Sequence, residues 1–203
     1  MKFEVSENVD LEEWWAVADG CEYATFFHTP AWAKIFAETY PNMEIAATKF
    51  IFDDRVVIFP MMKISQKMGL LDFSTYHSNA PGVYGGWISD KPLTTEQAIG
   101  ITAWVIKRTK RLIWRINPFN RSLENLNLSE YGEIKEDFTQ YLDLNVGYEN
   151  LRPKFSRGHK NDINRALRKA VKFKIAKTIE DWQGFYQVYL DSVVHNLSSF
   201  KVP

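Results

Sequence analysis

The most informative stretch of this chain is residues 151–177, which read LRPKFSRGHKNDINRALRKAVKFKIAK. This basic stretch contains a single acid, Asp162, although the whole chain has 25 positive and 25 negative residues. Its positive residues are Arg152, Lys154, Arg157, Lys160, Arg165, Arg168, Lys169, Lys172, Lys174 and Lys177. A local positive field in a protein without net charge marks a place where an anion can be held.

The spacing within the basic stretch predicts an amphipathic helix that begins near Ser156, a suitable N-cap. At 100° per residue the apolar positions share one side of this helix, and the basic and polar positions recur every three or four residues on the other. The candidate phosphate-binding residues of that side are Arg157, Lys160, Arg165 and Arg168. Two interpretations stay open: a solvated helix face that is basic by chance, or a face that binds the phosphates of a nucleotide, coenzyme A or tRNA.

Composition limits the class of protein. The chain has 203 residues, enough for one large domain or for one domain and part of another, and 45% of them are apolar. A lone cysteine, Cys21, excludes an internal disulfide and fits a reducing compartment. The acidic N-terminal residues lack the apolar core of a secretory signal, and no apolar run has the length of a membrane span. We therefore expect a cytoplasmic protein without membrane insertion.

The pattern along the chain predicts alternating short strands and helices. Strands are expected at residues 3–5, 44–52, 55–64, 68–75, 112–116, 138–144 and 173–176. Helices are expected at residues 10–18, from Thr29-Pro30 to about residue 40, at 94–110, in the basic stretch, and at 178–195. In the helix at 94–110, Ile99, Ala103 and Ile106 are expected to face inward. Residues 75–87 are rich in Gly, Pro, Ser and His and must form a loop.

Three segments carry a resemblance to known proteins. Residues 25–36 read TFFHTPAWAKIF, residues 83–89 read VYGGWIS, and residues 156–189 combine the basic helix with an acidic helix start and the sequence FYQVY. These segments resemble the FemAB-like proteins of the GNAT acyltransferase superfamily. The matching positions of the family's basic-helix motif are Lys160, Ile163, Arg165, Ala166 and Lys169. The predicted element order is similar to that of the GNAT fold, an α+β domain with a mixed, largely antiparallel sheet.

The resemblance implies two tandem GNAT-like domains, a first at residues 1–147 and the N-terminal part of a second at 148–203. It also implies transfer of an acyl or aminoacyl group to an amine on a small molecule, a peptide or a cell-envelope precursor such as that of peptidoglycan. The donor would be an acyl-CoA or an aminoacyl-tRNA. Family members often carry a phosphate-binding lysine four residues after the opening Trp; that position is Phe36 here, and Lys34 stands two residues earlier.

The loop at residues 75–87 supplies a second group of candidates. Tyr84, Gly85, Gly86 and Trp87 can line a substrate cleft, because glycine lets the backbone approach a ligand closely. Tyr76 and His77 stand where the preceding strand gives way to the loop, a common place for functional groups. The alternative is a tight turn packed under aromatic side chains.

Neither a covalent nucleophile nor a metal site is apparent in the sequence. The four histidines are scattered without metal-ligand spacing, so no metal is expected. Amine attack on a bound acyl donor needs mainly positioning, an oxyanion donor and a route for the proton, and no catalytic residue can be assigned from the sequence. The competing hypothesis is a catalytically silent GNAT-like module that binds RNA, another polyanion or a protein partner through the basic helix.

Overall fold

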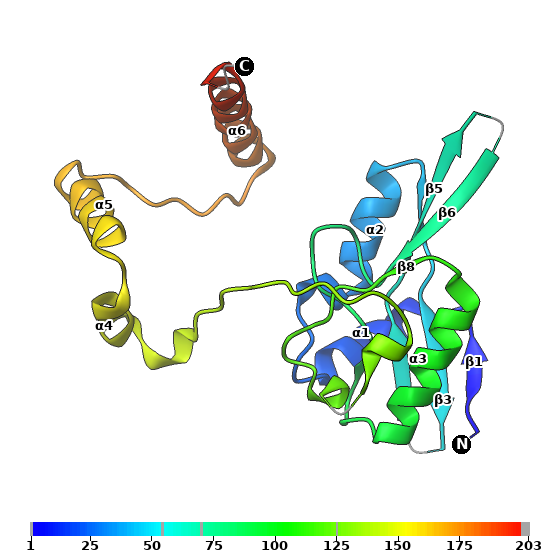
Figure 1. Cartoon of the computed structure of the whole chain (residues 1–203). Coiled ribbons are helices and arrows are strands. Elements are labelled where there is room, and N and C mark those ends of the chain that lie inside the picture. The colour runs from blue at the N-terminus through cyan, green and yellow to red at the C-terminus, as the bar shows by residue number, and fades with distance from the viewer. Residues whose placement is uncertain (1, 54, 70, 125, 200–203) are drawn as a thin grey trace. The chain divides into compact units, whose positions relative to one another are not determined.

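The computed structural model describes residues 2–53, 55–69, 71–124 and 126–199. The chain forms two units, Met1–Glu136 (unit 1) and Asp137–Pro203 (unit 2). Unit 1 contains two sheets and unit 2 is built from helices and loops (Figure 1). The expectation of an α+β chain with mostly antiparallel sheets is thereby confirmed. The division into two GNAT-like domains at residues 147 and 148 stays a prediction.

Unit 1 contains eight strands and three α-helices among the described residues. In chain order they are β1 (Glu4–Ser6), α1 (Leu11–Gly20), α2 (Pro30–Thr39), β2 (Met43–Ile45), β3 (Thr48–Phe52), β4 (Arg55–Phe59), β5 (Met62–Met68), β6 (Leu71–His77), β7 (Ile88–Ser89), α3 (Thr95–Thr109) and β8 (Leu112–Ile113). Asp10 caps α1 by accepting hydrogen bonds from the backbone N–H groups of Glu12 and Glu13, both 3.0 Å. Thr29 and Pro30 start α2 as the sequence predicts.

One long hairpin connects the two sheets, whose strand orders are β1-β3-β4-β7 and β2-β5-β6-β8. Its first arm runs through β2 and β3, its second through β4 and β5, and the pairing keeps one register from Met43 opposite Ile64 to Thr48 opposite Phe59. The strands predicted at 44–52 and 55–64 therefore pair as a hairpin, and this hairpin passes from one sheet to the other between β4 and β5, near Pro60. Proline lacks the N–H that a ladder needs, which suits it to this crossing point.

The core of unit 1 lies between the sheets and their covering helices. One cluster includes Phe50, Phe59, Trp87 and Val105, and a second is centred on Trp14, Ile58 and Ile88. Such close-packed apolar interiors supply most of the stability of a domain.

Helix α3 turns a different face to the core from the one predicted. Its buried residues are Gln97, Ala98, Ile101, Thr102, Val105 and Thr109. Ile99 is 43% exposed, Ala103 is exposed and Ile106 is half-buried, so the predicted inward face is wrong for Ile99 and Ala103. The predicted face and the buried face both have helical spacing. The face that packs against the rest of unit 1 is the one with the smaller and more polar residues.

Unit 2 contains α4 (Tyr148–Leu151), α5 (Arg157–Arg168) and α6 (Ile179–Ser199). The described residues of this unit include no strand, so the strands predicted at 138–144 and 173–176 are wrong. Leu151 is buried, but Phe138, Phe173 and Trp182 are exposed, as are most of the other large apolar side chains of this unit. An alternating pattern forms a strand only when a neighbouring strand satisfies its backbone groups, and these two segments have none within unit 2.

Candidate functional site

The loop at residues 78–87 separates two strands, β6 and β7, that run in the same direction. β6 pairs antiparallel with β5, and β7 pairs antiparallel with β4, so both run in the same direction along one arm of the long hairpin. Between them the chain leaves the ladder and returns at Ile88. On the other side, β8 pairs parallel with β6, and an isolated parallel bridge joins Gly85 to Ile116. Breaks of this kind place loop groups and polar backbone atoms inside a sheet.

Asn79 ties this loop to the segment before α2. Its buried side-chain amide donates to the carbonyl oxygens of Phe27 at 2.6 Å and Tyr84 at 3.3 Å, and its Oδ1 accepts from the N–H of Ala80 at 2.7 Å. The rings of Phe27 and Tyr84 also meet edge to face, with centroids 6.3 Å apart. Two of the segments that carry the family resemblance, residues 25–36 and 83–89, therefore contact each other although they are distant in sequence.

A second asparagine holds the segment that follows β8. The side-chain amide of Asn117 donates to the carbonyl of Tyr23 at 2.9 Å, and its Oδ1 accepts from the N–H of Phe119 at 3.0 Å. Ser78 accepts at Oγ from the N–H of Arg115 at 3.2 Å. Asn79, Asn117 and Ser78 are all buried, and their bonds replace the ladder that the loop interrupts.

Gly85, Gly86 and Trp87 have structural roles in unit 1. A Cβ on Gly85 would lie 2.7 Å from the Cβ of Asn79, and Gly86 has φ +119° with Trp114 Nε1 2.9 Å from where its Cβ would stand. Trp87 is 1% exposed and packs edge to face against Trp114. Trp87 is thus a core residue and not an open cleft wall, and the tight turn under aromatic side chains describes these three positions.

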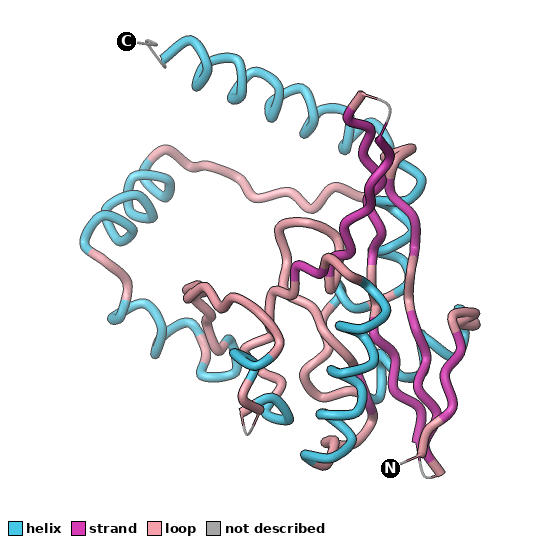
Figure 2. Tube along the Cα trace, turned by 45° about the vertical axis from the view of Figure 1, so that its right-hand side comes forward, coloured by secondary structure: helices cyan, strands magenta, loops and turns pink. Residues whose placement is uncertain are grey.

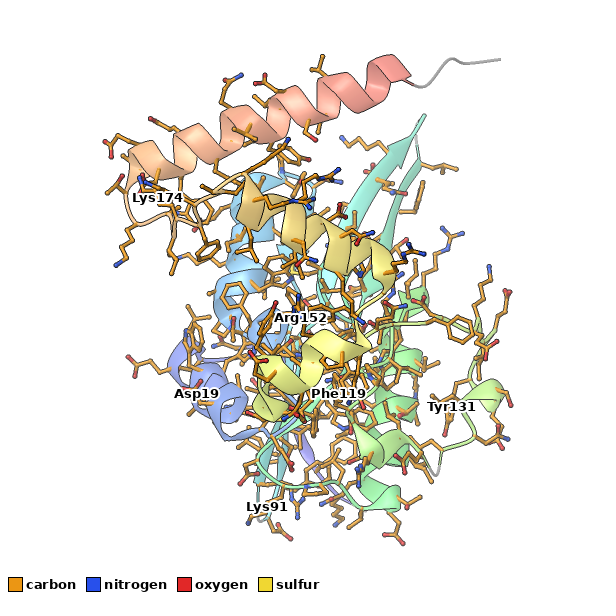
Figure 3. All side chains as sticks on the ribbon, turned by 90° about the vertical axis from the view of Figure 1, so that its left-hand side faces the viewer. Asp19, Lys91, Phe119, Tyr131, Arg152 and Lys174 are labelled. Carbon is orange, nitrogen blue, oxygen red and sulfur yellow. The ribbon has the colours of Figure 1, made fainter. Side chains whose placement is uncertain are left out.

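Tyr76, His77 and Tyr84 are the predicted site residues of unit 1 that remain half-buried. Tyr76 and His77 end β6, opposite Leu112 and Ile113 of β8. Partial burial holds the pKa of the His77 imidazole below its ordinary value. The Tyr84 ring lies among those of Phe27, His28 and Phe119, at centroid distances of 6.2–6.4 Å. The labelled Phe119 can be followed in Figure 3.

His28 is a buried histidine that the sequence presents only as part of a motif. Its ring is fully buried, and Nδ1 accepts from the backbone N–H of Thr25 at 3.1 Å. The neutral ring therefore carries its hydrogen on Nε2, which has no hydrogen-bond partner among the described groups. Burial lowers the pKa of His28 to about 4, so the ring is neutral at physiological pH.

The basic helix forms where the sequence predicts it, as α5. Ser156 is its N-cap, accepting at Oγ from the N–H of His159 at 3.2 Å. Lys160 donates to the carbonyl of Pro153 at 2.7 Å, and Arg165 binds the Asp162 carboxylate at 2.7 Å. Two of the four candidate cations are thus engaged locally.

The side chains of Arg157 and Arg168 are exposed, and their guanidinium groups form no hydrogen bond or ion pair with the described residues. They are the more available groups for an anion. Arg152 and Lys174, labelled in Figure 3, lie before and after α5. Lys34, the fifth predicted phosphate ligand, belongs to α2 in unit 1 and stands 3.7 Å from the Glu38 carboxylate, with both side chains exposed.

Within the described residues, no group of three or more His, Cys, Asp or Glu side chains is placed to hold a metal ion. The same residues include no helix that is long and apolar enough to cross a membrane.

Comparison of the chain with protein-family models, with curated proteins and with solved structures finds no match to any of them.

Proposed function

We propose that this chain is an acyl- or aminoacyl-transferase of the FemAB-like group, which moves an acyl group from a phosphate-bearing donor to an amine. The observation that carries the proposal is the contact between the segments at residues 25–36 and 83–89. Asn79 joins them by its bonds to Phe27 and Tyr84. These two segments carry the family resemblance in unit 1. If the resemblance were a coincidence, there would be no reason to expect two segments so distant in sequence to be in contact.

The chemistry requires few side chains. An amine attacks the acyl carbonyl directly, the donor's leaving group departs, and a base or water takes the proton of the amine. Tyr76, His77 and Tyr84 are half-buried polar groups near the interrupted strand, and a neutral His77 is able to accept a proton. In unit 2, taken by itself, the exposed guanidinium groups of Arg157 and Arg168 are suited to binding a phosphate. The donor class stays open between acyl-CoA and aminoacyl-tRNA.

A thermal-shift screen of the full chain tests the proposal. The probes are acetyl-CoA, a long-chain acyl-CoA, a UDP-sugar and tRNA. Since a ligand at about 100 times its Kd stabilises by about 2.7 kcal/mol, the true donor should raise Tm by roughly 5–10 °C. Incubation of the stabilising donor with free amines should then release CoA or deacylated tRNA.

Matched variants separate donor binding from non-specific charge effects. Arg157→Gln with Arg168→Gln removes the two unengaged cations, and Lys91→Gln with Lys135→Gln removes two exposed lysines of unit 1. The first pair should abolish the shift and the second should leave it intact. Absence of any shift and of any transfer with all four probes would overturn the transferase assignment.

A further inference from the structure

The segment that follows α5 exposes apolar and basic side chains together. Leu167, Val171, Phe173 and Ile175 are 72%, 67%, 90% and 63% exposed. Among them stand Arg168, Lys169, Lys172 and Lys174, all exposed. A soluble surface seldom presents large apolar side chains so close together without a partner. We call α5 with residues 169–177 the basic–apolar surface.

The sequence alternates along this segment. Residues 171–177 read VKFKIAK and form neither helix nor strand. The segment is drawn as an extended connection between α5 and α6 (Figures 1 and 2). In an extended chain successive side chains point to opposite sides, so Val171, Phe173 and Ile175 share one side and the lysines flank them.

The far end of the segment is held in place. The Asp181 carboxylate accepts from the backbone N–H of Lys177 at 3.1 Å and also binds the ammonium of Lys174. Both interactions keep the pKa of Asp181 below its ordinary value. The apolar side chains therefore sit on a tethered connection, bordered by α5 at one end and by this turn at the other.

The mixture of side chains discriminates between anionic partners. Cations alone suit any polyanion, including nucleic acid. Nucleic acid bases stack on aromatic rings and offer little to aliphatic groups, so Leu167, Val171 and Ile175 would stay in water on RNA. An anionic bilayer has phosphates for the cations and, just beneath them, a hydrocarbon boundary for the aliphatic groups.

We propose that the basic–apolar surface adsorbs to an anionic phospholipid bilayer. Val171, Phe173 and Ile175 enter the boundary between headgroups and acyl chains. Arg157, Arg168 and Lys172, which have no ion-pair partner among the described residues, contact lipid phosphates. The protein lies on the membrane and does not span it. The proposal shares Arg157 and Arg168 with the donor proposal above, and flotation tests it without any acyl donor.

Vesicle flotation of the full chain is the test. The probes are vesicles of phosphatidylcholine alone and of phosphatidylcholine with about one third phosphatidylglycerol. The chain should float with the anionic vesicles and stay in solution with the neutral ones. Raising the ionic strength from about 0.05 M to about 0.5 M should release it, because screening weakens the contacts between cations and headgroups.

Two variants separate the charge contribution from the apolar one. Arg157→Glu with Lys172→Glu should lower partitioning about 25-fold or more, since each basic residue near an anionic surface contributes about fivefold. Residue 157 is in the first helical turn, where an acid favours the helix, so this variant keeps α5 intact. Lys91→Glu with Lys135→Glu makes the same change in net charge on unit 1 and should leave partitioning unchanged.

Ile175→Ser should lower partitioning about tenfold, and Leu71→Ser, a similarly exposed leucine of unit 1, should not. The same panel is measured against single-stranded poly(U) RNA. Flotation that does not exceed that of neutral vesicles overturns the proposal, as does an Ile175→Ser variant that binds normally. Tight poly(U) binding without vesicle binding assigns the surface to nucleic acid instead.

Discussion

Phe59 in unit 1 and Phe173 in unit 2 are the same residue type in opposite situations. Phe59 is fully buried in β4 against Trp87 and Trp114, whereas Phe173 is 90% exposed. The same contrast holds for most large apolar side chains of the two units. Unit 1 is held by long-range strand pairing and a buried apolar core. The helices of unit 2 are held by local bonds such as the Ser156 cap, the Lys160 contact to Pro153 and the turn at Asp181.

The difference shows which interactions make elements and which make a domain. Caps and periodic spacing are enough to define α5, because they act within a few residues. An isolated helix of 12 residues is nevertheless marginal in water. Burial of the exposed apolar side chains of unit 2 would therefore stabilise it more than any further local bond. A surface that covers these side chains will raise the stability of the unit.

The largest expected effect is the loss of stability when Phe59 is replaced, compared with the replacement of Phe173. Phe59→Ala should destabilise unit 1 by about 3–5 kcal/mol, because the cavity lies among rings that cannot collapse into it. Phe173→Ala should change the free energy of unfolding by less than about 0.5 kcal/mol. Urea titration followed by tryptophan fluorescence measures unit 1, since every tryptophan except Trp182 lies there, and amide hydrogen exchange measures the helices of unit 2 for Phe173→Ala. Equal costs for the two substitutions would remove the distinction between the units.

A smaller effect is the pH dependence of the stability of unit 1, which depends on the buried His28. The unfolded chain protonates His28 as the pH falls through about 6.5, whereas the folded chain does so only near 4. The stability that a neutral His28 provides is therefore present above pH 6.5 and is lost between pH 6.5 and 4. The loss amounts to roughly 3 kcal/mol.

Urea titrations at several pH values check this with His28→Gln, whose side-chain oxygen can still accept from the Thr25 N–H. The advantage of the native chain over the variant should shrink on acidification. His77 is only half-buried, so His77→Gln should alter the pH dependence less. Parallel stability curves for the native chain and His28→Gln would show that His28 titrates normally.

Much of the fold could be predicted from sequence because its signals are local. The start of α2, the cap of α1 and the basic helix α5 each depend on residues within one turn of each other. The errors occur where distant partners decide. Residues 138–144 and 173–176 alternate as strands do, but alternation contains no information on where a pairing strand lies. In α3, two faces have apolar residues at helical spacing, and packing against the sheet determines which of the two is buried.

The candidate site divides in the same way. The exposed cations of α5 could be found because charge and spacing are visible in the sequence. The buried hydrogen bonds of Asn79 could not be found, since Asn79 bonds to the carbonyl of Phe27 across 52 residues. From the sequence alone, an asparagine in a Gly- and Pro-rich loop that is buried and joins two segments cannot be distinguished from an exposed asparagine in a turn. The sequence likewise leaves two positions open for Trp87, because an aromatic residue after two glycines fits a cleft wall and a core equally, and the structure places it in the core.

The smallest expected effect strengthens unit 2 instead of weakening unit 1. α5 ends with the N–H of Val171 bonded to the carbonyl of Ala166 at 3.0 Å and the N–H of Ala170 bonded to that of Leu167 at 3.0 Å. Ala170 occupies the left-handed position of this motif, with φ +49°. Glycine adopts that conformation without the Cβ penalty, so Ala170→Gly should stabilise α5 by about 0.5–1 kcal/mol.

Amide hydrogen exchange within α5 measures this effect, because a local change need not appear in the unfolding of unit 1. Protection of the α5 amides should rise about two- to fivefold in Ala170→Gly. Ala166→Gly makes the same chemical change inside the helix, where it should cost up to about 1 kcal/mol and lower protection. If both variants lower protection, the end of α5 is not set by this motif. If Ala170→Gly alone raises protection, local backbone geometry limits the stability of α5, as expected where most large apolar side chains of the described residues of unit 2 are exposed.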